Sequence, residues 1–205
     1  MVEAVERVVA LVRKLQASGL PIDHVDLGGG LGVKYREGEQ TPSIAAAVQA
    51  MRQIVEQTGL KAVVEPGRSI VAEAGVLLTS VLYRKNNGGK EFAIIDAAMN
   101  DLIRPSLYKA FHEITPVLES TAPPMEVDLV GPVCESGDWI AKSRTLPTLN
   151  SGDLLAIHTA GAYGFGMASN YNSRGRAAEV LVDGDTFRVA RQRESWDDLV
   201  RGESL

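Results

Sequence analysis

Two segments carry residues that could bind a phosphate or another charged ligand. Gly28, Gly29 and Gly30 follow a short apolar run, and consecutive glycines let backbone N–H groups approach a phosphate without side-chain interference. Glu65 and Arg68 follow the next apolar run; a carboxylate can hold a proton on a ring nitrogen, and a guanidinium can grip a phosphate or carboxylate with two hydrogen bonds. Taken singly, the glycines are equally well explained as a tight turn, and the Glu–Arg pair is better explained as a surface ion pair.

The sequence has one cysteine, Cys134, in the polar segment Gly-Pro-Val-Cys-Glu-Ser-Gly-Asp. Most lone cysteines are small buried apolar residues. This one follows a predicted strand and stands beside Glu135, where a thiol could act as an acid. No second cysteine and no histidine spacing supports a metal site, so none is predicted. The histidines fall in a predicted strand, helix and strand and are expected to be structural: His24, His112 and His158.

Three further residues could contact a carboxylate or phosphate. Arg104 and Tyr108 stand four positions apart on a predicted helix, so they share one face and could bind a carboxylate. A pair of solvated side chains explains the same pattern more simply. Tyr163, in Gly-Ala-Tyr-Gly after another predicted strand, could donate a hydrogen bond to a phosphate, or could be an aromatic residue packed in a β-turn.

The elements that would position these groups follow two different patterns. In residues 1–74, apolar residues recur every three to four positions over 2–15 and 44–55, as in helices with one buried face. Short apolar runs at 22–27 and 62–64 predict strands. The order helix, strand, helix, strand, helix predicts an α/β repeat with parallel strands, whose carboxyl-end loops carry the chemistry. Residues suited to cap or end the two long helices are Ser43, Gly19 and Gly59.

After about residue 75 the pattern becomes strand-rich. We expect a mainly antiparallel β-domain over 75–193, with one helical insertion around 102–112 and a short, poorly anchored helical tail over 194–205. The predicted strands of this domain are 76–83, 92–95, 126–130, 153–159, 178–182 and 186–190.

Composition excludes several classes of protein. The 205 residues carry a net charge of −5 and a pI of about 5.3, with no long basic run, which argues against a nucleic-acid partner. No stretch approaches the roughly 18 apolar residues of a membrane helix, so no membrane association is predicted. A single cysteine excludes a disulfide framework, and a reducing cytoplasm is the expected location.

The order of the motifs is more specific than any one of them. GGGLG at 28–32, EPGR at 65–68, IRPSLYKAFH at 103–112, GPVCESGD at 131–138 and GAYGFGMASNYNSR at 161–174 together resemble the diaminopimelate decarboxylases. These are pyridoxal-phosphate enzymes of the alanine-racemase-like fold family. The resemblance implies the C-terminal part of an (α/β)8 barrel followed by a mainly antiparallel β-domain.

The resemblance also implies a reaction and a role for each candidate residue. The enzymes of this family convert meso-2,6-diaminopimelate to L-lysine and CO2 with pyridoxal 5'-phosphate, as homodimers with shared active sites. The cofactor phosphate would be held by Gly28, Gly29, Gly30, Gly67 and Arg68, and the pyridine nitrogen by Glu65. Substrate contacts would come from Arg68, Arg104, Tyr108, Glu135 at the distal end, and Tyr163, which also touches the cofactor. Cys134 would be the proton donor, and with Glu135 it would reach into the partner subunit's site.

The sequence lacks parts of that family's pattern. The family's cofactor-bearing lysine stands upstream of the matching segment, and only two of the eight barrel strands can be recognised in 1–74. We therefore expect this polypeptide alone to be inactive, whether it is a gene fragment, one half of a split enzyme or a truncated form. Two other functions remain open: a non-catalytic dimerisation or binding module, or a segment of a related diamino-acid decarboxylase of the ornithine or arginine type.

Overall fold

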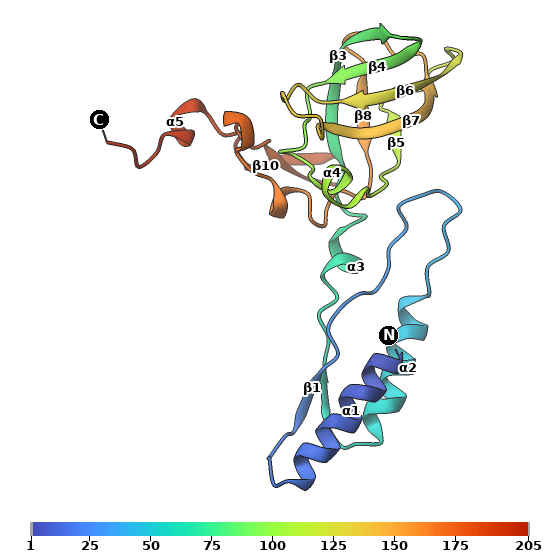
Figure 1. Cartoon of the computed structure of the whole chain (residues 1–205), viewed down its shortest axis with the longest axis vertical. Helices are drawn as coiled ribbons and strands as arrows, with labels where there is room; N and C mark the ends of the chain where they lie inside the picture. The colour runs from blue at the N-terminus through green and yellow to red at the C-terminus, as the bar shows by residue number, and fades with distance from the viewer. Residues whose placement is uncertain (1, 205) are drawn as a thin grey trace. The chain divides into compact units, whose positions relative to one another are not determined.

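The computed structural model describes residues 2–204, which form two compact units that divide between Ala72 and Glu73. We refer to them as unit 1, up to Ala72, and unit 2, from Glu73 onward. Figure 1 shows the helices and short strands of unit 1 and the curled sheet of unit 2. The sequence pattern changes two residues further along, near residue 75.

Two amphipathic helices provide most of the core of unit 1. Helix α1 (Val2–Ala17) and helix α2 (Ile44–Glu56) occupy the expected positions. The Ser43 hydroxyl oxygen accepts a hydrogen bond from the Ala46 amide at 3.0 Å, which satisfies one of the free N–H groups at the start of α2. The buried apolar residues that join helices and strands are Val5, Val9, Val12, Val25, Leu31, Met51 and Val55.

The strands of unit 1 are short and parallel, as the sequence pattern predicts. Strand β1 (His24–Asp26) pairs with β2 (Lys61–Val63) in the register Val25 to Ala62. A one-and-a-half-turn helix, α3 (Gly67–Val71), follows β2. Because parallel strands end on the same side of a sheet, the loops after β1 and β2 are brought together.

Unit 2 is built on one six-stranded sheet that curls into a nearly closed barrel (Figure 1). Its order is β5-β8-β3-β4-β6-β7, and every neighbouring pair is antiparallel except β4 and β6. The strands are β3 (Leu77–Asn87), β4 (Lys90–Ile95), β5 (Ile114–Pro116), β6 (Pro124–Val130), β7 (Trp139–Pro147) and β8 (Leu154–Ile157). The sequence pattern predicted four of these strands; β5 and β7 were not predicted.

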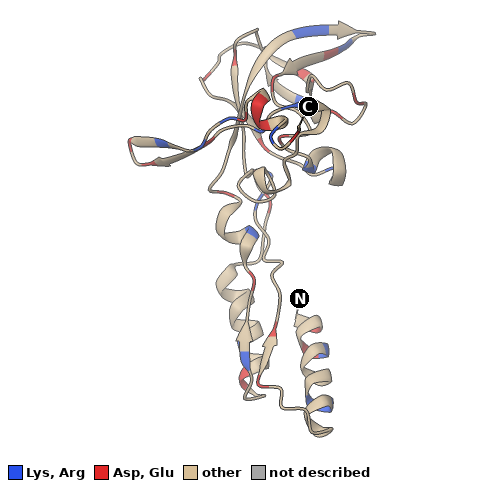
Figure 2. Ribbon diagram, turned by 90° about the vertical axis from the view of Figure 1, so that its left-hand side faces the viewer, with Lys and Arg blue, Asp and Glu red and all other residues tan. Residues whose placement is uncertain are grey.

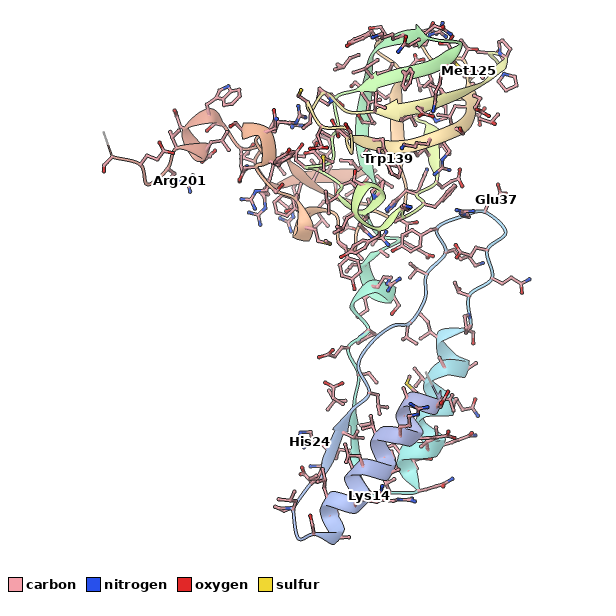
Figure 3. All side chains as sticks on the ribbon, in the orientation of Figure 1. Lys14, His24, Glu37, Met125, Trp139 and Arg201 are labelled. Carbon is pink, nitrogen blue, oxygen red and sulfur yellow. The ribbon has the colours of Figure 1, made fainter. Side chains whose placement is uncertain are left out.

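The interior of the curled sheet is apolar and fully buried. Its largest aliphatic side chains come from five different strands or their ends, so closing the sheet buries them together. The side chains along the strands, with Met125 and Trp139 labelled, can be followed in Figure 3. The core residues below 2% exposure are Val81, Ala93, Ile95, Leu102, Val127, Leu129, Ile140, Leu149, Leu155 and Ile157.

The expected helical insertion over 102–112 is shorter than predicted. Helix α4 covers only Arg104–Tyr108, because Lys109 adopts a left-handed backbone conformation with φ of 53° and ends it. His112 therefore lies outside the helix, between α4 and β5. The Arg144 guanidinium of β7 donates a hydrogen bond of 2.8 Å to the His112 carbonyl oxygen, which ties β7 to the segment that leads into β5, the opposite edge of the sheet.

The C-terminal part of unit 2 is a hairpin followed by an anchored segment. Strands β9 (Glu179–Asp183) and β10 (Thr186–Arg191) pair only with each other among the described strands, and short helical turns at Phe165–Met167 and Tyr171–Ser173 precede them. Helix α5 (Trp196–Leu199) begins with a capping box at Ser195. At the first residue of the expected tail over 194–205, the Glu194 carboxylate is bound by Arg176 and Asn170.

Charge and hydropathy along the chain show no extreme. Lys and Arg alternate with Asp and Glu along both units rather than forming one continuous run (Figure 2). Among residues 2–204, no helix has the length and apolarity needed to cross a lipid bilayer.

We predict that Glu194→Gln releases the segment after residue 193 from the rest of unit 2. Hydrogen bonds from the Arg176 side chain and amide and from Asn170 hold the pKa of Glu194 at about 2, against an ordinary value of 4.5. Because the folded pKa is the lower one, this carboxylate stabilises the fold above about pH 4.5, and that stabilisation is lost as the pH falls toward 2.

The measurement is the rate of limited proteolysis at residues 194–204. Wild type should be cut more slowly than Glu194→Gln at pH 6, and the difference should shrink as the pH approaches 2. The matched control is Glu203→Gln, a fully exposed position in the same segment. Equal cleavage of wild type and Glu194→Gln at pH 6 would show that these contacts do not anchor the segment.

Candidate functional site

The two loops of unit 1 that were singled out from the sequence lie side by side. The Leu27 amide donates to the Val63 carbonyl at 2.9 Å, and the Glu65 amide donates to the Gly28 carbonyl at 2.9 Å, so the parallel pairing of β1 and β2 continues into both loops. A Cβ atom at Gly29 would stand 2.2 Å from the Glu65 carbonyl oxygen. Only glycine therefore permits this approach of the two loops.

The backbone of the glycine loop is shaped for an anion, but two of its expected donors are already used. Gly28 and Gly30 have φ of 67° and 84°, a left-handed conformation that bares the backbone amides. The Gly28 amide donates to the Asp26 carboxylate at 2.8 Å, and the Gly67 amide donates to the Glu65 carbonyl at 2.9 Å. The Gly28 and Gly67 amides are thus not available to a phosphate, and Arg68, another expected phosphate ligand, is half-buried.

A cavity of about 260 Å³ opens beside Gly28 and Gly29. Its walls are otherwise mainly apolar, with side chains from α2 and α3 such as Ile44, Met51 and Ile70. An apolar wall suits a hydrocarbon group better than a phosphate, because a buried charge needs polar partners. Glu65, by contrast, is exposed at the end of β2, where its carboxylate is free to meet a ring nitrogen.

In unit 2, the loop that contains Cys134 is held from within by a buried aspartate. The Asp138 side chain is 4% exposed, and its two carboxylate oxygens accept hydrogen bonds of 2.7 Å from the amides of Met99 and Val133. Burial raises the pKa of this carboxyl group, and the two amides oppose that shift. A Cβ at Gly131 would collide with the carboxylate at 2.4 Å, so glycine is required there.

Cys134 and Glu135 stand on the loop that Asp138 holds, and both are exposed to solvent. Cys134 is an exposed free thiol, which agrees with the hypothesis of a chemical role and not with the alternative of a small buried residue. The Glu135 carboxylate accepts hydrogen bonds from the Tyr171 hydroxyl at 3.3 Å and from the Gly137 amide at 3.2 Å. The negative charge of Glu135 raises the pKa of Tyr171. Tyr171 was not singled out from the sequence, since nothing in its spacing links it to residue 135.

Helix α4 and the loop after β8 bring the other candidates together in part. Arg104 is 9% exposed, and its guanidinium lies 6.0 Å from the centre of the Tyr163 ring, a cation–π distance. Tyr163 itself has φ of 60°, an unusual conformation for a tyrosine. Tyr108 is 61% exposed at the end of α4, so it and Arg104 differ in environment although they stand four residues apart. The Ser106 hydroxyl donates to the Gly137 carbonyl and so joins α4 to the cysteine loop.

The candidates thus form one group in each unit. Unit 1 holds the three glycines, Glu65, Gly67 and Arg68; unit 2 holds the Arg104–Tyr163 pair and the cysteine loop with Glu135, connected through Ser106. The sequence did not identify the residues that order the second group. Ser106 and Asp138 bind backbone atoms of other segments, and Tyr171 binds the side chain of Glu135, 36 positions away.

We predict that Asp138→Asn loosens the cysteine loop. Either orientation of the new amide places an NH2 group against a backbone N–H, so one buried donor loses its partner at a cost of about 1–3 kcal/mol. Hydrogen exchange of the Met99 and Val133 amides should accelerate, while Asp185→Asn in the β9–β10 turn should leave it unchanged. Unchanged hydrogen exchange in Asp138→Asn would show that the Asp138 carboxylate does not hold the cysteine loop.

Comparison with known families places the chain in a family of pyridoxal-dependent decarboxylases. The family described as "Pyridoxal-dependent decarboxylase, C-terminal sheet domain" matches residues 16–161. Curated relatives extend the likeness to almost the whole chain. Diaminopimelate decarboxylase of Pseudomonas aeruginosa is 55% identical over 203 residues, which are 99% of this chain and 48% of the relative. The enzyme of Vibrio cholerae is 48% identical over 205 residues, or 100% of this chain and 49% of the relative.

Solved structures give the same result. Diaminopimelate decarboxylase from Helicobacter pylori, complexed with L-lysine, matches with a TM-score of 0.89 and 45% identity over 98% of this chain and 49% of that chain. A lysine/ornithine decarboxylase from Vibrio vulnificus, complexed with cadaverine, matches with a TM-score of 0.74 and 27% identity over 83% of this chain and 46% of that chain.

The resemblance to the diaminopimelate decarboxylases that the motif order indicated is thereby confirmed, and the chain spans about half the length of the curated relatives it matches. This chain belongs to the pyridoxal-dependent decarboxylase family and carries the C-terminal sheet domain of that family.

Proposed function

We propose that the chain provides the substrate-binding and proton-donating half of a diaminopimelate decarboxylase, which converts meso-2,6-diaminopimelate to L-lysine and CO2. The observation that carries the proposal is the clamped, solvent-facing loop with Cys134 and Glu135, joined through Ser106 to the helix that carries Arg104. The identity of 55% and 48% to two diaminopimelate decarboxylases, over nearly all of this chain, supports it further. The L-lysine in the Helicobacter pylori complex is the product that this reaction would yield.

We propose that unit 1 is part of an (α/β)8 barrel, with β1 and β2 as two of its eight strands. Their parallel pairing and the gathering of both following loops at the carboxyl ends support this assignment. Strand β2 is exposed along its length in unit 1, whereas the strands of a parallel barrel have both faces covered by other parts of the barrel.

The residues present fit pyridoxal phosphate. The amides of Gly29 and Gly30 and the Arg68 guanidinium would hold the phosphate, with Gly28 and Gly67 shaping the loops rather than donating. The Glu65 carboxylate would hold a proton on the pyridine nitrogen. When bound, the cofactor supplies a sink for the electron pair left by the departing CO2. Tyr163 would touch the cofactor and the substrate.

Each end of the substrate is charged, and charged and polar side chains of unit 2 could bind these ends. Arg104 would bind a carboxylate of the substrate, because a guanidinium matches a carboxylate with paired hydrogen bonds. We propose Arg68 and the exposed Tyr108 as further substrate-binding residues. Glu135 would accept hydrogen bonds from the ammonium group at the distal end. The Cys134 thiol would deliver a proton to the substrate carbon that has lost CO2. We propose that Cys134 and Glu135 serve the partner subunit's site in a homodimer.

The test is CO2 release from meso-diaminopimelate by residues 1–205 joined to the N-terminal half of the Pseudomonas aeruginosa relative. This chimera should be active with pyridoxal phosphate, and Cys134→Ala should lower kcat by about 10²–10⁴-fold, the usual contribution of a positioned acid. Ser136→Ala, two residues away, is the matched control and should retain turnover. Full activity of Cys134→Ala would refute the proton-donor role, and an inactive chimera that still dimerises would favour the non-catalytic alternative.

Active sites that are shared between two subunits lead to a separate prediction for mixed dimers. Cys134→Ala and Glu65→Ala chimeras should each be nearly inactive, yet a refolded mixture should regain activity. In a mixed dimer, one site combines an intact Glu65 from one subunit with an intact Cys134 from the other. Absence of any recovery in mixtures shown to contain mixed dimers would place Cys134 in its own subunit's site.

A further inference from the structure

We propose that His112 is a positioning residue: as a neutral imidazole, it holds the Arg104 guanidinium in place for a carboxylate of the substrate. The role of Arg104 toward a substrate rests on the function proposed above, whereas the contact between the two side chains is a feature of the fold itself. The sequence suggested only a structural histidine within a helix, and no role in the site.

The hydrogen bonds of His112 fix its tautomer. Its side chain is fully buried, with Nδ1 2.9 Å from the His158 carbonyl oxygen and Nε2 2.9 Å from an Nη atom of Arg104. A carbonyl oxygen only accepts, so Nδ1 must carry the proton. A guanidinium only donates, so Nε2 must accept. Only the neutral ring protonated at Nδ1 satisfies both neighbours.

The surroundings of the ring favour the neutral form. Burial is the largest cause that lowers the pKa of His112, and the positive charges of Arg104 on α4 and Arg144 on β7 lower it further. The hydrogen bond to the His158 carbonyl acts in the opposite direction. Arg144 also donates to the His112 carbonyl oxygen and stacks 3.4 Å from the centre of the Phe111 ring, so the backbone that carries the imidazole is held as well.

A neutral acceptor has a specific consequence for Arg104. A carboxylate in the place of His112 would orient the guanidinium but would also neutralise it. An imidazole orients the guanidinium and leaves its charge to act on an anionic ligand. The Tyr163 ring, 6.0 Å away, is the second neighbour that limits the position of the guanidinium. His112 thus acts through Arg104 and has no contact with substrate of its own in this proposal.

Two substitutions separate this role from a purely structural one. His112→Gln places an amide oxygen near the position of Nε2 and keeps the acceptor for Arg104, while it loses the donor to His158. His112→Asn places an amide nitrogen near the position of Nδ1 and keeps that donor, while it loses the acceptor. Each variant loses one hydrogen bond of the ring, so a general loss of stability would affect both.

The first measurement uses the 205-residue chain and requires no activity. Nitrogen-15 NMR of the imidazole at pH 7.5 should show a protonated Nδ1 and an unprotonated Nε2 for His112, with the exposed His24 as internal control. Hydrogen exchange of the Arg104 guanidinium should accelerate in His112→Asn and remain slow in His112→Gln. A His112 protonated at Nε2, or equal exchange in wild type and His112→Asn, would overturn the inference.

The second measurement is the KM for meso-diaminopimelate in the active chimera. His112→Asn should raise KM by about 10-fold or more with little change in kcat, since a hydrogen bond to a charged group contributes about 1.5–3 kcal/mol. His112→Gln should restore KM toward wild type. A larger loss in His112→Gln than in His112→Asn would overturn the positioning role. An inactive chimera with the expected tautomer would count against the proposed function, while the His112–Arg104 contact would stand.

Discussion

A small curled sheet cannot bury a charge or a polar ring without giving it partners, and that constraint organises unit 2. A buried group that lacks its hydrogen bonds costs several times what a formed bond gains. Asp138 is therefore bound by two amides from separate segments, and His112 by a carbonyl and a guanidinium. In satisfying these groups, the fold fixes the loop that bears Cys134 and Glu135 and the side chain of Arg104 on helix α4. The buried polar residues are the link between the fold and the site.

Unit 1 follows a simpler constraint, the register of two parallel strands. Once β1 and β2 pair, the loops that follow them must share one side, and a side chain at Gly29 would prevent their approach. The groups that we propose for the cofactor phosphate in unit 1 and those that we propose for the substrate in unit 2 thus depend on different physical constraints. In unit 1, glycine leaves backbone amides exposed. In unit 2, buried hydrogen bonds hold the side chains in place.

Sequence reasoning succeeded where the signal is local. Helix periodicity with Ser43 as cap, the short strands expected at 22–27 and 62–64 and found at 24–26 and 61–63, and the turn residues of unit 1 all depend on neighbouring positions. It failed where long-range pairing decides: strand β5 has three residues, and it exists because it pairs with β8. The helix at 104–108 was overestimated because nothing in the sequence reveals the left-handed Lys109.

The sequence likewise predicted only part of the candidate site. The residues with evident chemistry, such as Cys134 and Arg68, stand in recognisable motifs. The residues that hold them, such as Asp138 and His112, are separated from their partners by 5 to 46 positions, and no periodicity connects them. The expectation that the histidines are structural was too coarse for His112, which contacts a candidate site residue directly.

The central claim is that the charged groups of this chain select a substrate with an amino-acid group at each end. The most direct measurement is the ratio of kcat/KM for meso-diaminopimelate to that for L-ornithine, which lacks the distal carboxylate and is one methylene shorter, in the active chimera. A site built to pair a charged group should favour diaminopimelate by about 10⁴-fold, because ornithine leaves its partners unpaired. Equal or higher kcat/KM for ornithine would contradict the claim and assign the chain to a different diamino-acid decarboxylase.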